Sequence, residues 1–239
     1  MNYINSWDND TRSASYAKLE FPNTYHLAYR DLPEIVSKHS KGTTALDFGC
    51  GTGRSSRFLK KLGFEVTGID ISPSMIRQAV EKDPNGTYML VEDGKYQGIP
   101  DDFDLITSIF TFDNIPVQQR VLILRGLKQK LSKHGCLVML DSNPELYHHE
   151  WASFSTAPFP GNRIAKTGDP VYTIMNDVED KTPVEDYFFS EQDYMKLFEE
   201  AGLKLIKRYA PLGRLDEPFV WKSELMLAPW IIYVLQKGV

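Results

Sequence analysis

One short segment, Leu46-Asp-Phe-Gly-Cys-Gly-Thr-Gly53, constrains the fold of this chain more than any other. An apolar run at residues 43–48 leads into it and a helical period at residues 55–62 follows it, so the glycines form the turn between a buried strand and a helix. Glycines at alternate positions let the backbone turn tightly and approach a ligand, while the next helix points its free N–H groups at that ligand. The segment therefore predicts a site for a nucleotide-like ligand.

Short apolar runs and helical periods alternate along the rest of the chain. Further strands are expected at residues 64–69, 87–91, 103–109 and 136–140, and helices are expected to begin at Ser72 and Pro116, the second ending at Gly135. A helix capped by Ser190 and strands at 203–209 and 230–235 close the chain, and the first 40 residues form helical pieces. This order predicts an α/β fold around a parallel sheet.

The spacing of the glycines separates this turn from two other nucleotide sites. A dinucleotide fingerprint, G-x-G-x-x-G, would need a glycine at position 54, where the chain has Arg54. A phosphate-binding Walker A loop needs Gly-Lys-Ser or Gly-Lys-Thr after the turn, and neither follows. An acidic residue, Asp70, stands roughly 20 residues beyond Gly49 at the end of the second strand, where a carboxylate can accept hydrogen bonds from both hydroxyls of a ribose.

Four motifs stand in order along residues 25–140: Asp47-Phe-Gly-Cys-Gly-Thr-Gly53, Asp70, Glu92-Asp93-Gly94 and Phe103-Asp-Leu-Ile106. With them the chain resembles the class I S-adenosylmethionine-dependent methyltransferases. The resemblance implies an α/β, Rossmann-like seven-stranded sheet whose last strand is antiparallel, with a small insertion covering it after strand 5. It also implies S-adenosyl-L-methionine as the cofactor.

The resemblance implies a role for each matched position. It implies that Gly49, Cys50 and Gly51 lie under the methionine moiety of the cofactor. It implies contacts to ribose and adenine from Asp70, Ile71, Met75, Asp93 and Gly94. Near the sulfonium, it implies Ile109 and Phe110. In the N-terminal segment, Tyr16 or Tyr25 could close the site and Arg30 could meet the methionine carboxylate. Packing of these aromatic residues on the sheet is an equal alternative.

Methyl transfer from a sulfonium is an in-line displacement, so positioning of the acceptor can suffice without a dedicated base. If the acceptor needs a base, the candidate catalytic residues are Asp113, His148 and His149. Capping of the helix begun by Pro116 is the favoured role for Asp113, and exposure to solvent is the favoured state of the two histidines. No metal site is expected, because no histidine partner at metal-ligand spacing is present.

The alternation of strands and helices stops between residues 142 and 189. Aromatic residues are frequent there: Tyr147, Trp151, Phe154, Phe159, Tyr172, Tyr187, Phe188 and Phe189. This composition favours a lid over a mostly apolar small-molecule pocket, with coverage of the core or a dimer contact as alternatives. The expected organisation is an N-terminal helical cap (1–40), a cofactor-binding methyltransferase domain (41–141 and 190–239) and a substrate-covering insertion (142–189).

The composition of the chain limits the kinds of partner that it is expected to bind. The 239 residues carry a formal charge of −5, which argues against nucleic acid and anionic membranes. Two cysteines are too few for a disulfide framework, and the apolar run at 228–235 is too short to span a bilayer, so a cytoplasmic protein is expected, as a monomer or homodimer. The favoured function is methylation of a small, partly apolar or aromatic molecule. Methylation of tRNA or protein, and cofactor binding without transfer, are the alternatives.

Overall fold

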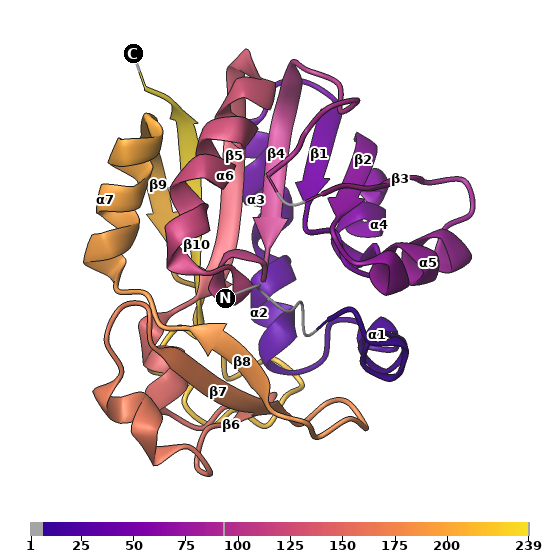
Figure 1. Ribbon diagram of the computed structural model, residues 1–239. Helices are drawn as coiled ribbons and strands as arrows, with labels where there is room; N and C mark the ends of the chain where they lie inside the picture. The colour runs from indigo at the N-terminus through magenta and orange to yellow at the C-terminus, as the bar shows by residue number, and fades with distance from the viewer. Residues whose placement is uncertain (1–6, 93, 239) are drawn as a thin grey trace.

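The computed structural model describes residues 7–92 and 94–238 and is built on one seven-stranded sheet (Figure 1). Its strands lie in the order β3-β2-β1-β4-β5-β10-β9. They are β1 (Thr44–Phe48), β2 (Glu65–Asp70), β3 (Thr87–Leu90), β4 (Phe103–Ile109), β5 (Leu131–Ser142), β9 (Leu203–Tyr209) and β10 (Trp230–Lys237). Strand β10 runs antiparallel to both of its neighbours, β5 and β9. The predicted α/β sheet with an antiparallel last strand is confirmed.

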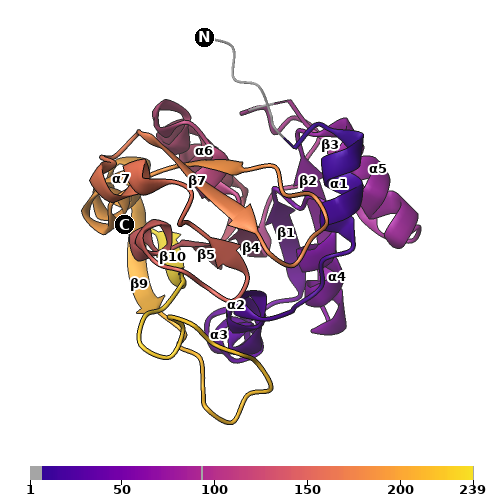
Figure 2. The same ribbon diagram turned by 90° about the horizontal axis from the view of Figure 1, so that it is seen from below.

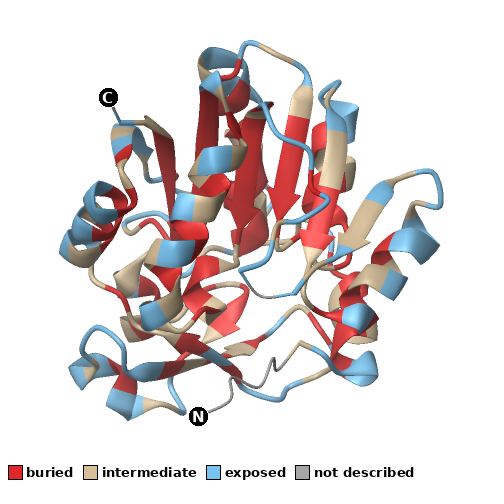
Figure 3. Ribbon diagram, turned by 45° about the horizontal axis from the view of Figure 1, so that its top comes forward, coloured by how far each residue is buried: buried red, intermediate tan, exposed pale blue. Residues whose placement is uncertain are grey.

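Alternation of side chains along the strands produces a buried core on each face of the sheet (Figure 3). In β4, for example, Leu105 packs in one core and Ile106 in the other. The first core includes residues of α2 (Thr24–Arg30), α3 (Leu32–His39) and α4 (Arg54–Lys61); the second includes residues of α6 (Val117–Lys130) and α7 (Glu191–Ala201). Two further helices are α1 (Asp10–Ala17) and α5 (Pro73–Lys82).

The predicted helix boundaries are confirmed where a capping side chain marks them. Ser72 accepts a hydrogen bond from the Met75 N–H at the start of α5, with Pro73 as the first helical residue. Ser190 caps α7 in the same way, and Gly202 ends that helix in the left-handed conformation.

The expected end of α6 at Gly135 is wrong. The helix ends at Lys130, and Gly135 lies inside β5, which begins at Leu131. The pairing of β5 with β4 is irregular here, because Leu131 is opposite Phe103 and the next pair joins Cys136 to Leu105. A Cβ atom on Gly135 would lie 2.5 Å from the Phe103 carbonyl oxygen, so the glycine permits close approach of two strands.

The insertion forms a second, three-stranded antiparallel sheet. Its strands are β6 (Phe154–Ser155), β7 (Pro170–Met175) and β8 (Val184–Tyr187), accompanied by the short helices η2 (Pro144–His148) and η3 (Pro160–Ile164). The arrowheads of β1 and β4 point toward this small sheet (Figure 1), and from below β7 crosses in front of the ends of the central strands (Figure 2). The insertion therefore lies over the edge of the main sheet at which its parallel strands end.

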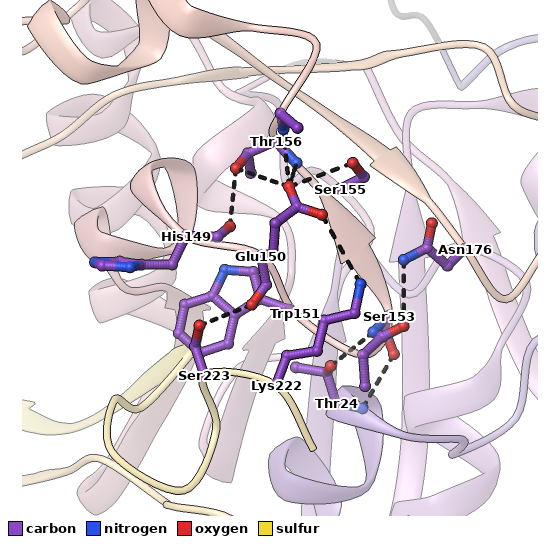
Figure 4. A network of polar contacts seen from close by, with 12 residues as sticks. Thr24, His149, Glu150, Trp151, Ser153, Ser155, Thr156, Asn176, Lys222 and Ser223 are labelled. Atoms are coloured by element: carbon purple, nitrogen blue, oxygen red, sulfur yellow. Dashed lines mark hydrogen bonds and ion pairs between the residues drawn. The ribbon is translucent and has the colours of Figure 1, made fainter. Parts of the chain in front are cut away.

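A polar network fastens the insertion to two other parts of the chain (Figure 4). Thr24 of α2 and Ser153 exchange hydrogen bonds, with the Thr24 N–H donating to Ser153 Oγ at 3.0 Å and the Ser153 N–H donating to Thr24 Oγ1 at 2.9 Å. Ser223, from the loop before β10, donates to the Glu150 carbonyl oxygen at 2.8 Å. Buried Glu224 accepts from Thr24 Oγ1 at 2.6 Å and from the Ala152 N–H at 2.8 Å.

No helix within the described residues has both the length and the apolar character that a membrane crossing requires.

We expect Glu224→Ala to lower the free energy of unfolding by about 2 to 3 kcal/mol, because it leaves buried donors on Thr24 and Ala152 without an acceptor. Chemical denaturation measures the change. Glu81→Ala, which removes an exposed carboxylate from α5, is the matched control and should change stability by less than about 0.5 kcal/mol. Equal effects of the two substitutions would show that the network does not fasten the insertion.

Candidate functional site

The glycine-rich turn after β1 has the geometry that its sequence predicts. Gly49, Gly51 and Gly53 have φ angles of +69°, +52° and +75°, in the region that favours glycine. A Cβ atom on Gly49 would also lie 2.4 Å from the Thr111 side chain, which follows β4. Since β1 lies between β2 and β4, the turn sits where connections leave in opposite directions, the usual place for a ligand in an open α/β sheet.

The buried side chain of Asp47 stabilises this turn. Its buried carboxylate accepts hydrogen bonds from the hydroxyls of Ser55 and Ser56, both at 2.6 Å, and from Thr107 Oγ1 at 2.9 Å. Burial raises the pKa of Asp47, whereas the three hydroxyl donors oppose that shift by stabilising the charged form. The acid thereby joins β1, the first turn of α4 and β4.

Asp70 stands at the end of β2, with its side chain directed at the turn. Its two carboxylate oxygens accept hydrogen bonds from the backbone N–H groups of Gly51, at 2.9 Å, and Ser72, at 2.8 Å. A carboxylate has about four acceptor positions, so each oxygen can accept a further hydrogen bond. Asp70 also lines the cavity above the turn, where hydroxyl groups of a ligand could supply those bonds.

A cavity of about 1020 Å³, counting its open mouth, lies above the turn; we call it the first cavity. Nine of the residues proposed for the cofactor line it: Gly49, Cys50, Gly51, Asp70, Ile71, Met75, Gly94, Ile109 and Phe110. Asp93, proposed beside Gly94, lies outside the described residues. The structure thus brings together proposed residues from the ends of β1, β2 and β4 and from the segment after β3.

Arg54 is a cation of the first cavity that the sequence reasoning did not select. The residue is 5% exposed, and its guanidinium donates to Tyr16 Oη at 2.8 Å and to the Glu20 carbonyl oxygen at 2.9 Å. It also lies over the ring of Tyr25, 4.9 Å from the centroid. Within residues 7–92 and 94–238 no carboxylate forms an ion pair with it. A buried cation without an ion-pair partner suits a ligand carboxylate.

Arg30, the residue proposed for the methionine carboxylate, lies elsewhere. Its guanidinium binds Asp31 at 2.8 Å, Glu217 at 2.7 Å and the Leu212 carbonyl oxygen at 3.0 Å, and it does not line the first cavity. These contacts fasten α2 to the loop between β9 and β10. Position in the N-terminal segment suggested Arg30, but its carboxylate partners already neutralise its charge.

A second cavity, of about 430 Å³ counting its open mouth, adjoins the first. The two share four lining residues: Trp7, Tyr16, Phe110 and Asn114. Phe110 follows β4 with a φ angle of +57°, a strained conformation for a bulky residue. Its ring packs against Trp230, with centroids 4.6 Å apart. Phe110 is therefore held as part of the wall between the cavities.

The second cavity draws its lining from three parts of the chain. Besides the shared residues, it is lined by Tyr25 of α2, by Asp113, Ser142 and Trp230 from the main sheet and its loops, and by Leu146, Phe154, Thr173, Met175, Val184 and Asp186 of the insertion. Tyr25 thus lies beside this cavity and not in the first. No lysine or arginine is among the described residues that line it.

Asp113 does not cap α6, so that expectation is wrong. The helix begins at Val117 after Pro116, without a side-chain cap. Buried Asp113 accepts hydrogen bonds from Ser142 Oγ at 2.7 Å and from Asn114 Nδ2 at 2.9 Å. Burial raises the pKa of Asp113, whereas the hydrogen bond from Ser142 and the positive charge of Arg120 lower it. Its place is the wall of the second cavity.

His148 and His149 line neither cavity. Their rings lie 3.7 Å and 3.3 Å from the Glu145 carboxylate, and His148 also stacks on Phe188. Figure 4 shows the His149 ring directed away from Glu150 and its neighbours. Of the three proposed bases, only Asp113 is therefore in contact with a cavity. Among residues 7–92 and 94–238, no cluster of three or more acidic, histidine or cysteine side chains is arranged to hold a metal ion.

Two further lining residues carried no sequence signal. Trp7 lies in an N-terminal segment without periodicity and donates from Nε1 to Asn114 Oδ1 at 2.8 Å. Asp186 stands beside Glu185 in a short strand, and only the fold shows that Asp186 faces inward. Aromatic enrichment pointed to the insertion, but nothing in it distinguished one acid from the other.

Several known methyltransferases are similar to this chain in sequence or in fold. A family model described as "Methyltransferase domain" matches residues 45–135. The chain is 26% identical over 197 residues to N-demethylindolmycin N-methyltransferase of Streptomyces griseus, covering 80% of this chain and 82% of that protein. It is 39% identical over 164 residues to the 18S rRNA (guanine-N(7))-methyltransferase of Bos taurus, covering 64% and 56%. The CcbJ methyltransferase of Streptomyces caelestis has the same fold, with a TM-score of 0.69 at 16% identity over 99% of this chain and 100% of that one.

We expect Arg54→Met to weaken binding of S-adenosylmethionine by about 1.5 to 3 kcal/mol, because it removes the unpaired buried cation of the first cavity. Isothermal titration calorimetry measures the affinity. Arg30→Met is the matched control and should leave the affinity unchanged, since Arg30 lies outside that cavity. The reverse ranking of the two variants would assign the carboxylate to Arg30.

Proposed function

Because this chain is a class I S-adenosylmethionine-dependent methyltransferase, we propose that its methyl acceptor is a small, partly apolar or aromatic molecule. The observation that carries the proposal is the pair of adjoining cavities that share Phe110. The first presents the polar groups that the cofactor requires. The second presents a mostly apolar lining to a separate small molecule on the other side of the shared wall.

The proposed cofactor position follows from the chemistry of the first cavity. Arg54 would hold the methionine carboxylate, and Asp70 would accept from the ribose hydroxyls. Adenine would lie against Ile71 and Met75, which line the same cavity. This arrangement leaves the sulfonium beside Phe110, at the boundary with the second cavity.

In this arrangement the chain's own residues act by positioning. S-adenosylmethionine supplies an electrophilic methyl group, and the nucleophile must approach it in line with the breaking S–C bond, at roughly 3 to 3.5 Å. The aromatic walls of the second cavity would orient the acceptor and exclude water. A neutral hydroxyl or a carbon acid would also need a base, and Asp113 is the proposed base that such an acceptor could reach.

The lining of the second cavity supports a small acceptor. Its walls are mostly aromatic and aliphatic, and its charged residues are the acids Asp113 and Asp186. Carboxylates repel the phosphates of a nucleic acid, so this lining disfavours RNA as the partner.

Similarity to the bovine rRNA methyltransferase, at 39% identity, is the observation that favours an RNA acceptor as the second candidate. Similarity to the indolmycin-modifying enzyme extends over more of both chains and supports the small-molecule proposal. Incubation with methyl-labelled cofactor and separate pools of metabolites, RNA and protein distinguishes them. The proposal expects label in the metabolite pool; label in RNA or protein alone contradicts it, and cofactor binding without label in any pool supports a binding module.

We also propose that the insertion (142–189) encloses the acceptor and that the N-terminal cap (1–40) closes over both ligands. Phe154 of the insertion lines the second cavity and not the first, whereas the cap supplies Tyr29 to the first cavity, Tyr25 to the second, and Trp7 and Tyr16 to both. Two buried, unpaired cysteines, Cys50 and Cys136, support a reducing, cytoplasmic location.

We expect Phe154→Ala to raise the KM for the labelled acceptor about tenfold and to leave cofactor affinity unchanged, because it removes an aromatic wall of the second cavity alone. Steady-state kinetics with the acceptor and calorimetry with the cofactor measure the two effects. Phe159→Ala is the control: this insertion residue packs against Tyr172, with ring centroids 5.6 Å apart, and lines neither cavity. A loss of cofactor affinity larger than the loss of acceptor affinity would contradict the proposed cover.

A further inference from the structure

Asp186 presents an incompletely satisfied carboxylate to the second cavity. Alternation along β8 turns Asp186 inward and Glu185 outward, and Asp186 is 6% exposed. Its Oδ2 accepts from Tyr147 Oη at 3.1 Å. Among the described residues no hydrogen bond is made to Oδ1. Asp186 lines the second cavity, so a hydrogen-bond donor of a ligand can reach this oxygen from the cavity.

Among the described residues, no charged side chain forms an ion pair with Asp186. Asp113 lines the same cavity and adds a second carboxyl. The buried guanidinium of Arg120 donates to the carbonyl oxygens of Ile115, at 2.9 Å, and Tyr187, at 3.4 Å. In the described parts of the chain Arg120 forms no ion pair within 4 Å, and neither do the two acids. The charged residues among the described lining of this cavity are therefore both acids.

Aromatic rings make up much of the remaining wall: Trp7, Tyr16, Tyr25, Phe110, Phe154 and Trp230. Four of these rings pack on one another, with centroid distances of 5.5 Å for Tyr25 and Phe110, 5.3 Å for Tyr25 and Phe154, and 4.6 Å for Phe110 and Trp230. Arginines of the chain already lie over four of the six rings: Arg12 over Trp7, and Arg54 over Tyr16, Tyr25 and Phe110. Phe154 and Trp230 are the rings left to attract a cation of the ligand, and the Asp186 carboxylate in the same cavity supplies the matching charge and acceptor. This is the combination of groups that binds an organic ammonium ion.

We propose that the methyl acceptor carries a basic amine, and that its ammonium form is bound between Asp186 and the aromatic rings of the second cavity. The inference rests on the proposed small-molecule function and names its substrate class. An acceptor of this class pairs an apolar or aromatic skeleton with one positive charge. Asp186 and Asp113 then balance two neighbouring cations, the ammonium and the cofactor's sulfonium.

Proton linkage follows from the same geometry. Burial raises the pKa of Asp186 well above its ordinary value, and the carboxyls of Asp113 and Glu185 act in the same direction. The Tyr147 hydroxyl and the Arg120 guanidinium oppose them. An ammonium ion binds the ionised carboxylate, so amine affinity rises as pH increases from acidic toward neutral values. Binding of a neutral alcohol lacks this dependence.

Three matched probes test the inference directly: 2-phenylethylammonium, 2-phenylethanol and 3-phenylpropionate. Trp7 and Trp230 line the cavity, so tryptophan fluorescence reports binding to the enzyme saturated with S-adenosylhomocysteine. We expect the amine to bind at least about tenfold more tightly than the alcohol, and the acid to bind most weakly. Equal affinity for the three probes, or preference for the alcohol or the acid, overturns the inference.

Asp186→Asn should abolish the preference for the amine, whereas Glu185→Gln on the outer face of the same strand should keep it. Unchanged S-adenosylmethionine affinity in both variants shows that the fold and first cavity are intact. An Asp186→Asn variant that keeps the wild-type preference overturns the assignment. If Asp186→Asn fails to fold, the wild-type probe ranking and its pH dependence still decide the matter.

Failure of this inference and failure of the proposed function give different results. With methyl-labelled cofactor, metabolites are separated by cation exchange into cationic, neutral and anionic pools. Label in the cationic pool agrees with the inference. Label confined to the neutral or anionic pool overturns it and leaves small-molecule methylation standing. Label in RNA or protein alone overturns both proposals.

Discussion

The site depends most on the hydrogen bonds that the buried carboxylate of Asp47 accepts. This carboxylate accepts from the Ser55 and Ser56 hydroxyls of α4 and from Thr107 of β4, so it joins the strand before the glycine turn to the helix after it and to the neighbouring strand. A fully buried acid is costly unless donors surround it, and here three hydroxyls do so. The turn is therefore fixed before any ligand binds, and Asp70, which accepts a hydrogen bond from the Gly51 N–H, lines the first cavity.

The turn below the first cavity is fixed by contacts between neighbouring elements, whereas the second cavity is formed by several segments that lie far apart in the sequence. Side chains from α2, β10, the loop after β4 and the insertion meet there, and the network around Glu150 and Glu224 holds these segments together. Methyl transfer needs the acceptor and the methyl group in line, so segments far apart in sequence must be fixed relative to the sheet. Glu224, which holds the insertion to α2, and the strained Phe110, which lines the second cavity, both contribute to that rigidity.

Local patterns in the sequence were sufficient to predict the sheet, its helices and the residues that follow β1, β2 and β4. These features follow from hydrophobic periodicity, capping residues and glycine spacing, which act over a few neighbouring positions. The carboxylate-binding arginine could not be chosen in this way, because Arg30 and Arg54 differ only in their partners: Arg30 meets Glu217 from a distant loop, whereas Arg54 meets tyrosines. Gly135 was misread for the same reason, since its close neighbour is the backbone of another strand.

A crystal structure with S-adenosylhomocysteine bound tests the central claim, that two adjoining cavities bring donor and acceptor together across Phe110. The account predicts the ligand carboxylate on Arg54, the ribose hydroxyls on Asp70 and the sulfur facing the second cavity beside Phe110. A carboxylate bound by Arg30, or a sulfur directed away from the second cavity, would contradict the account, because no acceptor bound between the aromatic rings could then reach the methyl group.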